Sequence, residues 1–404
     1  MYIALPRQTR RARAIIVALS LLVASSLTFG YRAPGAAAGL PPVFVVDPTG
    51  DDAGPGTDAQ PWRNLGSALE RIQPGTILLV RNGVYAGPFF IHSQATAQAP
   101  ILVAAYPGHR PVIRAGEWQG LSVQDSAYVQ VRGFEVIGNA ATARAREVGL
   151  EIVNSHHVRF DINVIHDNGG GGISAIHSNH VSIENNEVYN TSWWAENQMS
   201  AISLWQMQSI GGPANPDGFS NYVNANYVHD NENRVGAITD GNCIILDSND
   251  DTGYSASTYI TNNVCRANGG RGIHIFRSSN AVVVNNTLFD DLRNLPTDGA
   301  ELSAIYAKNV LFRNNLVAPS RSGNAIAFYS ATNVSADHNA YVDTRAQALG
   351  ANDKLVPGLP RMFGIFPPID GPTSDAGNVD RAPVLDFLGH PRSGAPDIGA
   401  FELR

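Results

Sequence analysis

An internal repeat restricts the folds that are open to this chain. Eight segments share apolar residues at alternate positions, then an Asn-rich turn and a second apolar pair, as in VRFDINVIHD, VSIENNEVYN and AVVVNNTLFD. One position aligns in all eight segments, and it is occupied by Phe134, Asn163, Asn186, Asn226, Asn263, Asn286, Asn315 and Asn339. Successive members are 29, 23, 40, 37, 23, 29 and 24 residues apart. A base period of 23 or 24 with occasional insertions is typical of a solenoid whose loops vary in length.

Each repeat also carries an earlier short strand. These segments are GLEIVNS (149–155), GISAIHS (172–178), AISLWQM (201–207), CIILDSN (243–249), GIHIFRS (272–278), ELSAIYA (301–307) and AIAFYSA (325–331). Their second and fourth positions are almost all aliphatic or aromatic, whereas the third and fifth vary, so we expect one buried face and one exposed face. No helical periodicity separates the strands, which excludes helical crossovers. The sequence therefore predicts an all-β chain whose coils stack as a parallel β-helix.

The repeated asparagines have a structural explanation in such a fold. A residue that recurs once per coil lies directly above its equivalent, so we expect the seven asparagines to form a ladder of side-chain amides inside a turn. The His-Asp-Asn triplets that begin at His166 and His229 look like catalytic pairs. Their repeat position favours turn residues instead.

The regions on either side of the coils differ from them. Residues 43–120 are predicted to form an N-terminal cap and the first coils, with one helix near Asn64 to Ile72 that ends before Pro74. Such a helix is suited to covering the open hydrophobic end of a solenoid. Residues 121–345 are predicted to form the β-helix, and the Pro- and Gly-rich residues 346–404 an irregular cover for its other end.

The first 38 residues have the order of a secretory signal. An Arg-rich start is followed by an apolar run over residues 14–27 and by small residues at 36–38, although an uncleaved N-terminal anchor fits the same pattern. We expect cleavage, no membrane association afterwards, and a secreted or periplasmic, monomeric protein. The sequence has 28 basic and 35 acidic residues, and removing the leader leaves 23 basic ones, which argues against nucleic acid as a partner. Cys243 and Cys265 could pair, but two cysteines form no disulfide framework, and we interpret them as buried thiols.

Several motifs carry a resemblance to a known superfamily. The opening VDPTGDDAGPGTDAQPW, the RNGVY that follows, and APILVAAYPG at 99–108 precede the Asn-rich coils. Together they resemble right-handed parallel β-helix proteins of the pectate-lyase-like superfamily. The resemblance implies a right-handed, single-stranded β-helix over nearly the whole chain after the leader. It also implies an exported protein with a polysaccharide partner, usually a uronate lyase or a glycoside hydrolase and sometimes a binding protein.

The long intervals from 186 to 226 and from 226 to 263 mark the coils with extra loops, where a site is expected. An acidic segment from Asp230 to Asp251 is followed by an Arg-rich one from Arg266 to Arg321. The strand alignment places Trp205, Asp247 and Phe276 on successive coils of one face, with His274 beside them. Aromatic faces there can stack on sugar rings, while carboxylates and Arg bind hydroxyl or carboxyl groups.

We therefore expect one composite site on this face. The predicted catalytic residues are Asp247, His274, Arg271 and Asp240. The predicted substrate-binding residues are Trp205, Gln206, Phe276, Arg277 and Glu151. The predicted ligands of a calcium ion are Glu232, Asp240 and Asp247, whose oxygen atoms suit this hard cation.

Three functions fit this site. A lyase must neutralise the uronate carboxylate, by Ca²⁺ or Arg, before a base removes the neighbouring proton. A hydrolase would divide two carboxylates into a general acid and a nucleophile or base. Several β-helix lyases use a lysine base, but the only lysines here are Lys308 and Lys354, and neither matches, so the base would be His or Arg. The lyase remains the first expectation, the hydrolase the second, and a non-catalytic glycan-binding or surface protein the third.

Overall fold

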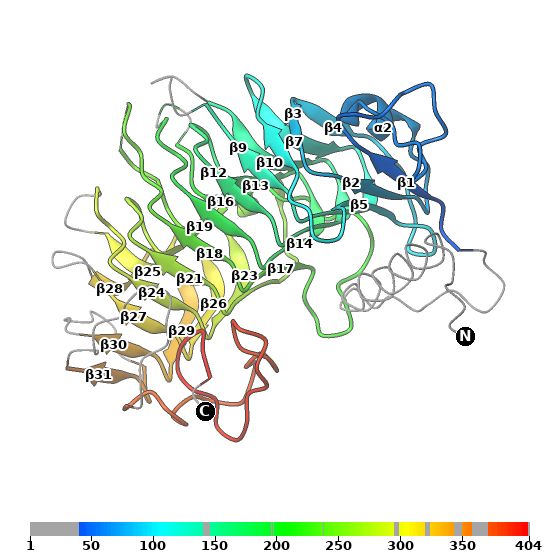
Figure 1. The fold of residues 1–404 in the computed structure, drawn as a ribbon. Helices are drawn as coiled ribbons and strands as arrows, with labels where there is room; N and C mark the ends of the chain where they lie inside the picture. The colour runs from blue at the N-terminus through cyan, green and yellow to red at the C-terminus, as the bar shows by residue number, and fades with distance from the viewer. Residues whose placement is uncertain are drawn as a thin grey trace, which may run out of the picture.

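The structure is a computed structural model. It describes residues 40–139, 146–194, 196, 198–236, 238–294, 299–319, 324–342, 350–357 and 371–402, so the predicted leader and parts of the predicted C-terminal cover lie outside the described residues. Three sheets of parallel strands wind around one hydrophobic interior (Figure 1). Each full coil contributes one strand to sheet C, then one to sheet A and one to sheet B, which confirms the predicted parallel β-helix.

Sheet C carries the strands that the sequence analysis placed first in each repeat. Its strands, in sequence order, are β4 (Phe89–Ile91), β7 (Gln119–Gln124), β10 (Val148–Val153), β13 (Ile173–Ile176), β16 (Ile202–Trp205), β19 (Ile244–Asp247), β22 (Ile273–Phe276), β25 (Ala300–Ile305) and β28 (Asn324–Tyr329). Neighbouring strands pair in parallel and without a slip, as in Trp205 opposite Asp247 and Asp247 opposite Phe276. The predicted register of this face is therefore confirmed.

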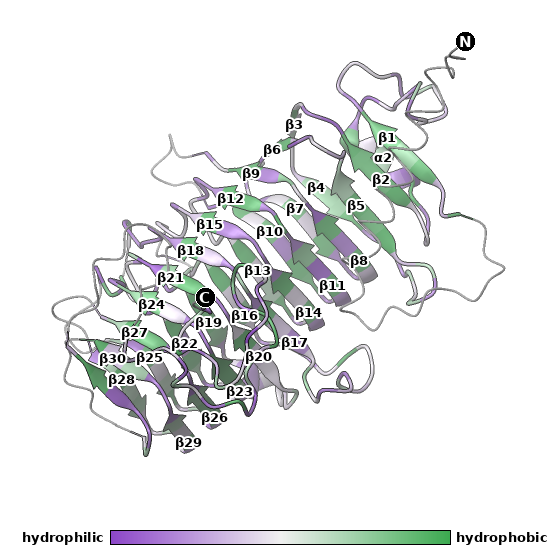
Figure 2. Cartoon of the chain, turned by 60° about the horizontal axis from the view of Figure 1, so that its bottom comes forward, coloured by the Kyte–Doolittle hydropathy of each residue, from purple (hydrophilic) through white to green (hydrophobic). Residues whose placement is uncertain are grey.

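Sheets A and B complete each coil. Sheet A contains β1 (Val43–Val46), β2 (Ile77–Val80), β5 (Ile101–Ala105), β8 (Ala127–Arg132), β11 (His156–Asp161), β14 (Asn179–Glu184), β17 (Asn221–Asn224), β20 (Thr258–Thr261), β23 (Ser279–Val284), β26 (Lys308–Arg313) and β29 (Thr332–Asp337). Sheet B contains β3 (Val84–Ala86), β6 (Val112–Arg114), β9 (Glu135–Ile137), β12 (Val164–His166), β15 (Glu187–Tyr189), β18 (Tyr227–His229), β21 (Val264–Arg266), β24 (Thr287–Phe289), β27 (Leu316–Ala318), β30 (Ala340–Val342) and β31 (Lys354–Val356). Figure 2 shows these strands stacked coil upon coil along the solenoid.

The asparagine ladder forms as predicted. The side-chain amide of Asn163 donates to Asn186 at 3.1 Å, and Asn186 donates to Asn226 at 3.0 Å. The same bond continues coil by coil to Asn339, which donates to the carboxylate of Asp353 at 3.1 Å. Because these amides are buried, each unmade bond would leave a polar group without water, so the ladder ties every coil to the next.

A 7-residue helix, α2 (Leu65–Arg71), lies at the N-terminal end, within one residue of the predicted bounds. The side chain of Asn64 accepts from the backbone NH of Ser67 at 3.1 Å, which is the N-cap arrangement that starts a helix. The buried face of the helix, with Leu65 and Leu69, belongs to the same hydrophobic cluster as the interior of the coils. The sequence therefore predicted both the presence and the bounds of this helix correctly.

Cys243 and Cys265 form a disulfide bond. Our interpretation of both residues as free thiols is wrong. Cys243 precedes β19 and Cys265 lies in β21 of the same coil, and both side chains point into the core, so their Cα atoms come within 5.8 Å. Linear sequence could not reveal this approach, because it depends on how one coil closes around the interior.

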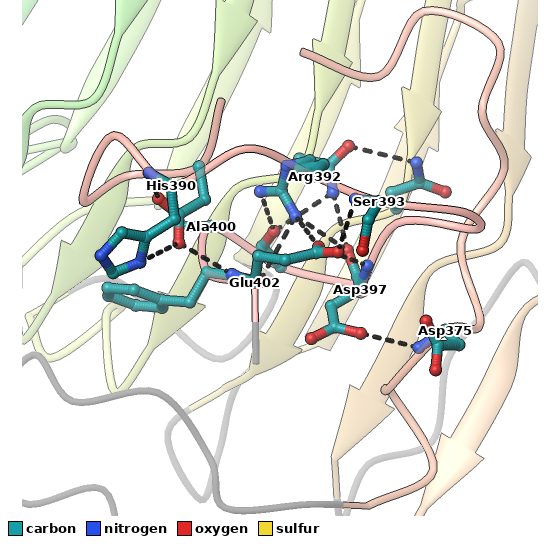
Figure 3. A network of polar contacts seen from close by, with 12 residues as sticks. Asp375, His390, Arg392, Ser393, Asp397, Ala400 and Glu402 are labelled. Carbon is teal, nitrogen blue, oxygen red and sulfur yellow. Dashed lines mark hydrogen bonds and ion pairs between the residues drawn. The ribbon is translucent and has the colours of Figure 1, made fainter. Parts of the chain in front are cut away.

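The described part of the C-terminal segment, residues 371–402, folds back along the corner between sheets A and B. Asn262, Asn285 and Asn314, which follow three successive strands of sheet A, donate to its backbone carbonyl groups. A buried ion pair between Arg392 and Glu402, at 3.1 Å, holds the segment together (Figure 3). This segment therefore straps several coils lengthwise.

Candidate functional site

The outer face of sheet C brings most of the predicted site residues together. Trp205, Asp247 and Phe276 occupy equivalent positions on β16, β19 and β22, about 4.8 Å apart per coil. His274 occupies the other outward position of β22, opposite Ser303 of β25. Asp247 is therefore flanked along the solenoid by two aromatic rings.

One part of the sequence prediction for this face is wrong. The third strand positions were expected to be exposed, yet Ser174, Ile245, His274 and Ser303 are all buried, with at most 5% of their surface accessible. The fifth position stays more open, and Trp205 is 39% exposed.

A long loop, residues 231–242, carries Asp240 to this face. Its packing requires glycine in the next coil, because a Cβ atom at Gly270 would lie 2.6 Å from the backbone oxygen of Asp240 and 2.7 Å from the side-chain oxygen of Asn242. The backbone NH of Gly270 also donates to Gly241 at 2.9 Å. Gly269 and Gly270, in the turn before β22, thus permit the loop over residues 231–242 to lie directly against the next coil.

Two asparagines that the sequence analysis missed hold Asp240 in place. The Asn242 side chain donates to one carboxylate oxygen of Asp240 at 2.8 Å and also to Ser200 at 2.9 Å. The side-chain oxygen of Asn233 accepts from the backbone NH of Asp240 at 2.9 Å. Their places in the acidic loop, within a few residues of Asp240, are the only sequence signal that could have suggested this role.

The two carboxyl groups of the site differ in environment. The pKa of Asp240 is raised to about 6, chiefly by burial and also by the charge of Asp247, while hydrogen bonds from Thr239 and Asn242 and the charge of Arg271 act in the opposite direction. Burial also raises the pKa of Asp247 above its ordinary value, opposed chiefly by the Ser248 hydroxyl, which donates to it at 2.7 Å. Two carboxyl groups in different environments can serve one as a proton donor and the other as an ionised carboxylate.

His274 and Arg271 complete the constellation. Burial lowers the pKa of His274 well below its ordinary value, and the charge of Arg271 lowers it further, so the imidazole is neutral at neutral pH. One ring nitrogen, Nδ1, lies 2.7 Å from the hydroxyl of Ser303, a partner that the sequence analysis did not identify. The positive charge of Arg271 lowers the pKa of both Asp240 and His274, so the three side chains are electrostatically coupled.

Two predicted binding residues lie at the edge of sheet C. Gln206 and Arg277 follow the fifth strand positions, and both have a positive φ. Arg277 donates to Asp251 at 2.7 Å, and Gln206 lies 3.3 Å from the ring of His177. Both side chains therefore border the strip that contains Trp205 and Phe276.

Two other predicted residues lie apart from this centre. Glu151 occupies the same outward column as His274 but four coils earlier, about 19 Å away by strand spacing, and it accepts a hydrogen bond from Ser122. Glu232 accepts from Arg234 at 2.8 Å and from Asn294 at 3.0 Å. The position of Glu232 in the sequence could not show that its carboxylate pairs with Arg234 and Asn294.

The expected calcium ligands do not assemble. In the described ranges, no three His, Cys, Asp or Glu side chains are arranged to hold a metal ion. The charge of Asp247 acts on Asp240, but Glu232 is engaged with Arg234 and Asn294. The residues present therefore do not fit the predicted calcium site, and no chemical step is derived through it.

Comparisons with known proteins agree on the fold. Residues 44–231 match the family model "Pel9A-like, right handed beta helix region". The crystal structure of pectate lyase Pel9A aligns with a TM-score of 0.58 at 18% identity, covering 91% of this chain and 98% of that one. The GH136 lacto-N-biosidase from Eubacterium ramulus aligns with a TM-score of 0.53 at 17% identity, covering 78% of this chain and 66% of that one. A search of curated proteins found no match.

Proposed function

We propose that this right-handed parallel β-helix protein of the pectate-lyase-like superfamily cleaves glycosidic bonds, with Asp240 and Asp247 as the acid and base of the reaction. One observation carries the proposal: the two carboxyl groups interact at the face of sheet C, and the pKa of Asp240 is raised to about 6. A group with that pKa can hold a proton near neutral pH and release it during a reaction. The aromatic rings of Trp205 and Phe276 on either side suit a sugar ring.

Hydrolysis is the reaction that this pair supports best. Asp240 in its protonated form donates its proton to the glycosidic oxygen as the bond to the anomeric carbon breaks. Asp247 in its ionised form attacks that carbon or takes a proton from the attacking water. Water supplies the hydroxyl group of one product, and the leaving sugar keeps the proton from Asp240. Cationic Arg271, which acts on Asp240, would hydrogen-bond the substrate hydroxyl groups, and neutral His274 is held by Ser303.

Lyase activity is the second candidate, and the arginines support it. Arg271 and Arg277 could neutralise a uronate carboxylate, which makes the neighbouring proton more acidic. A neutral His274 or an ionised Asp240 would take that proton, and the sugar oxygen at the adjacent carbon would leave, so that a double bond forms. The likeness to pectate lyase Pel9A supports the fold of this candidate, whereas the two acidic side chains beside Arg271 would repel a uronate.

The proposal includes export and a polysaccharide or oligosaccharide substrate. The Cys243–Cys265 disulfide is of a kind that persists in oxidising compartments outside the cytosol. No helix in the described ranges has the length and apolar character needed to cross a membrane. We propose that the leader over residues 1–38 directs secretion and that the enzyme acts as a monomer.

One screen separates the three candidates. The purified protein is incubated with neutral and uronate-containing glycans, with and without calcium, and both reducing ends and the ultraviolet absorbance of unsaturated products are recorded. New reducing ends without absorbance support the hydrolase, and new absorbance supports the lyase. Binding without either product indicates a non-catalytic glycan-binding protein. The absence of any product over a broad panel would refute both enzymatic proposals.

A further inference from the structure

Exposed or half-buried aromatic side chains continue beyond the carboxylate pair toward the C-terminal end of sheet C. We call Trp205, Phe276, Tyr306 and Tyr329 the aromatic stripe. Trp205, Phe276 and Tyr329 share the fifth strand position on β16, β22 and β28, and Tyr306 follows the fifth position of β25. Trp205 is 39% exposed, Tyr306 50% and Tyr329 62%. The stripe therefore reaches three coils past Asp247.

Packing within the fold does not account for these rings. Phe276 and Tyr306 meet edge to face at 6.3 Å between centroids, and Tyr306 and Tyr329 do so at 5.7 Å. Elsewhere on the molecule, the rings of Tyr128 and His157 stack face to face at 4.3 Å and cover each other. Edge-to-face contacts leave more ring surface open to a ligand.

The backbone at Tyr306 adds a second observation. The residue that follows the strand takes a left-handed conformation in the eight strands of sheet C from β7 to β28. These residues, with φ between 45° and 53°, are Asp125, Asn154, His177, Gln206, Ser248, Arg277, Tyr306 and Ser330. Asn, Asp and Gly tolerate this conformation well, whereas a bulky aromatic residue is strained in it. Tyr306 bears this strain although half of its side chain is exposed. Stability alone thus gives no reason for a tyrosine here.

The spacing of the stripe suits a linear glycan. Coils are about 4.8 Å apart, so Tyr329 lies about 14 Å from Asp247 along the solenoid axis. That length accommodates several sugar units side by side with successive coils. Arg277 and the hydroxyl groups of Tyr306 and Tyr329 add polar partners for sugar hydroxyl groups beside the aromatic faces.

We propose that the aromatic stripe binds the portion of a linear oligosaccharide or polysaccharide that extends from the cleaved bond toward the C-terminal end of the solenoid. This inference rests on the proposed function for the position of the cleaved bond. The enzyme then selects for chain length: ligands of four or more sugars bind more tightly than a disaccharide of the same linkage, because only they reach Tyr306 and Tyr329.

The test measures binding separately from turnover. Oligosaccharides of two to six sugars from xylan, cellulose, mannan and polygalacturonate are titrated by calorimetry into an Asp240→Asn variant, which retains the stripe. We expect affinity to rise at least tenfold between two and five sugars for one linkage. Adding Tyr306→Asn, which relieves the left-handed strain, and Tyr329→Ser should remove that gain without lowering the melting temperature.

Leu355→Ala is the matched control, because Leu355 is 55% exposed on sheet B, away from the stripe, and should change nothing. Affinity that is independent of chain length, an unchanged gain in the tyrosine variants, or no binding of any ligand would each overturn the inference. The proposed function fails separately, if the wild type binds the long ligands but never cleaves them.

Discussion

The carboxyl group of Asp240 lies close enough to Asp247 for the Asp247 charge to raise its pKa, although Asp240 belongs to a loop and Asp247 to strand β19. We expect Asp240→Asn and Asp247→Asn each to lower the turnover number by about 10²- to 10⁴-fold, since each removes one partner in proton transfer. The circular dichroism spectrum of each variant should remain that of the folded protein. Rates within a factor of two of wild type in either variant would exclude this pair from the mechanism.

The same pair predicts a bell-shaped dependence of activity on pH. A hydrolase needs Asp247 ionised and Asp240 protonated, so activity should rise above the ordinary aspartate range and fall as the pH passes about 6. The raised pKa also means that ionised Asp240 opposes folding above that pH. Asp240→Asn should therefore melt at a higher temperature than wild type at pH 7 and at the same temperature below pH 4. A melting difference that does not depend on pH would contradict this assignment.

A buried pair of acids, Asp291 and Glu301, should make the protein sensitive to alkali. Both side chains are fully buried, burial raises the pKa of each, and their mutual repulsion raises the pKa of Glu301 further. Stability is then complete at low pH and declines as the pH rises through the range in which the pair ionises. Glu301→Gln keeps an acceptor for the backbone NH of Asp291 and should stabilise the protein at pH 8 by about 1–3 kcal/mol.

Urea denaturation at pH 5 and pH 8 measures this effect. The gain from Glu301→Gln should be smaller at pH 5, where the wild-type pair is protonated. A variant that is less stable than wild type at both values would show that the acid pair is not a source of alkaline instability.

The histidines near the turn between sheets C and A should make the fold sensitive to acid. The pKa of His157 is lowered to about 3, chiefly by burial and also by the charges of His180 and His156. The His157 and His180 rings stack at 4.2 Å. Because these rings fold in the neutral form, stability is complete above their ordinary pKa of 6.5 and is lost as the pH falls below it.

His157→Phe keeps a ring in the stack but cannot take up a proton. The melting temperature of this variant should fall less between pH 7 and pH 4 than that of wild type. Identical slopes for the two proteins would show that other groups control acid unfolding.

The Cys243–Cys265 bond closes a loop with a sequence separation of 22. In the chain-entropy model, a link of this length stabilises the fold by about 3 kcal/mol. Reductant should therefore lower the urea midpoint of wild type to that of a Cys243→Ala/Cys265→Ala variant, and it should not affect the variant. If reductant leaves the wild-type midpoint unchanged while free thiols are detected, the bond contributes no stability.

The ion pair between Arg392 and Glu402 should be needed to hold the C-terminal segment against the coils. Glu402 also accepts from the backbone NH groups of Ser393 and Asp397, so Glu402→Ala leaves several buried donors without partners (Figure 3). We expect a loss of about 3–5 kcal/mol and faster proteolysis within residues 371–402. Glu402→Gln, which keeps the acceptor, should lose less. Equal protease resistance in the alanine variant and wild type would contradict this role.

The sequence by itself determined the repeating architecture, because period-two alternation and a recurring Asn are local patterns that every coil repeats. It also determined the register that aligns Trp205, Asp247 and Phe276, since equivalent positions in stacked coils are necessarily neighbours. The Asn163 to Asn339 ladder follows from the same rule.

Only the tertiary structure decided which loop residues reach the site. The repeat does not extend into residues 231–242, so nothing in the sequence distinguishes Asp240, whose pKa the Asp247 charge raises, from Glu232, which pairs with Arg234. The disulfide and the burial of His274 also depend on contacts across a coil or between loops. Periodicity specifies what is repeated, whereas an insertion is positioned by its own packing, here against Gly270 of the next coil.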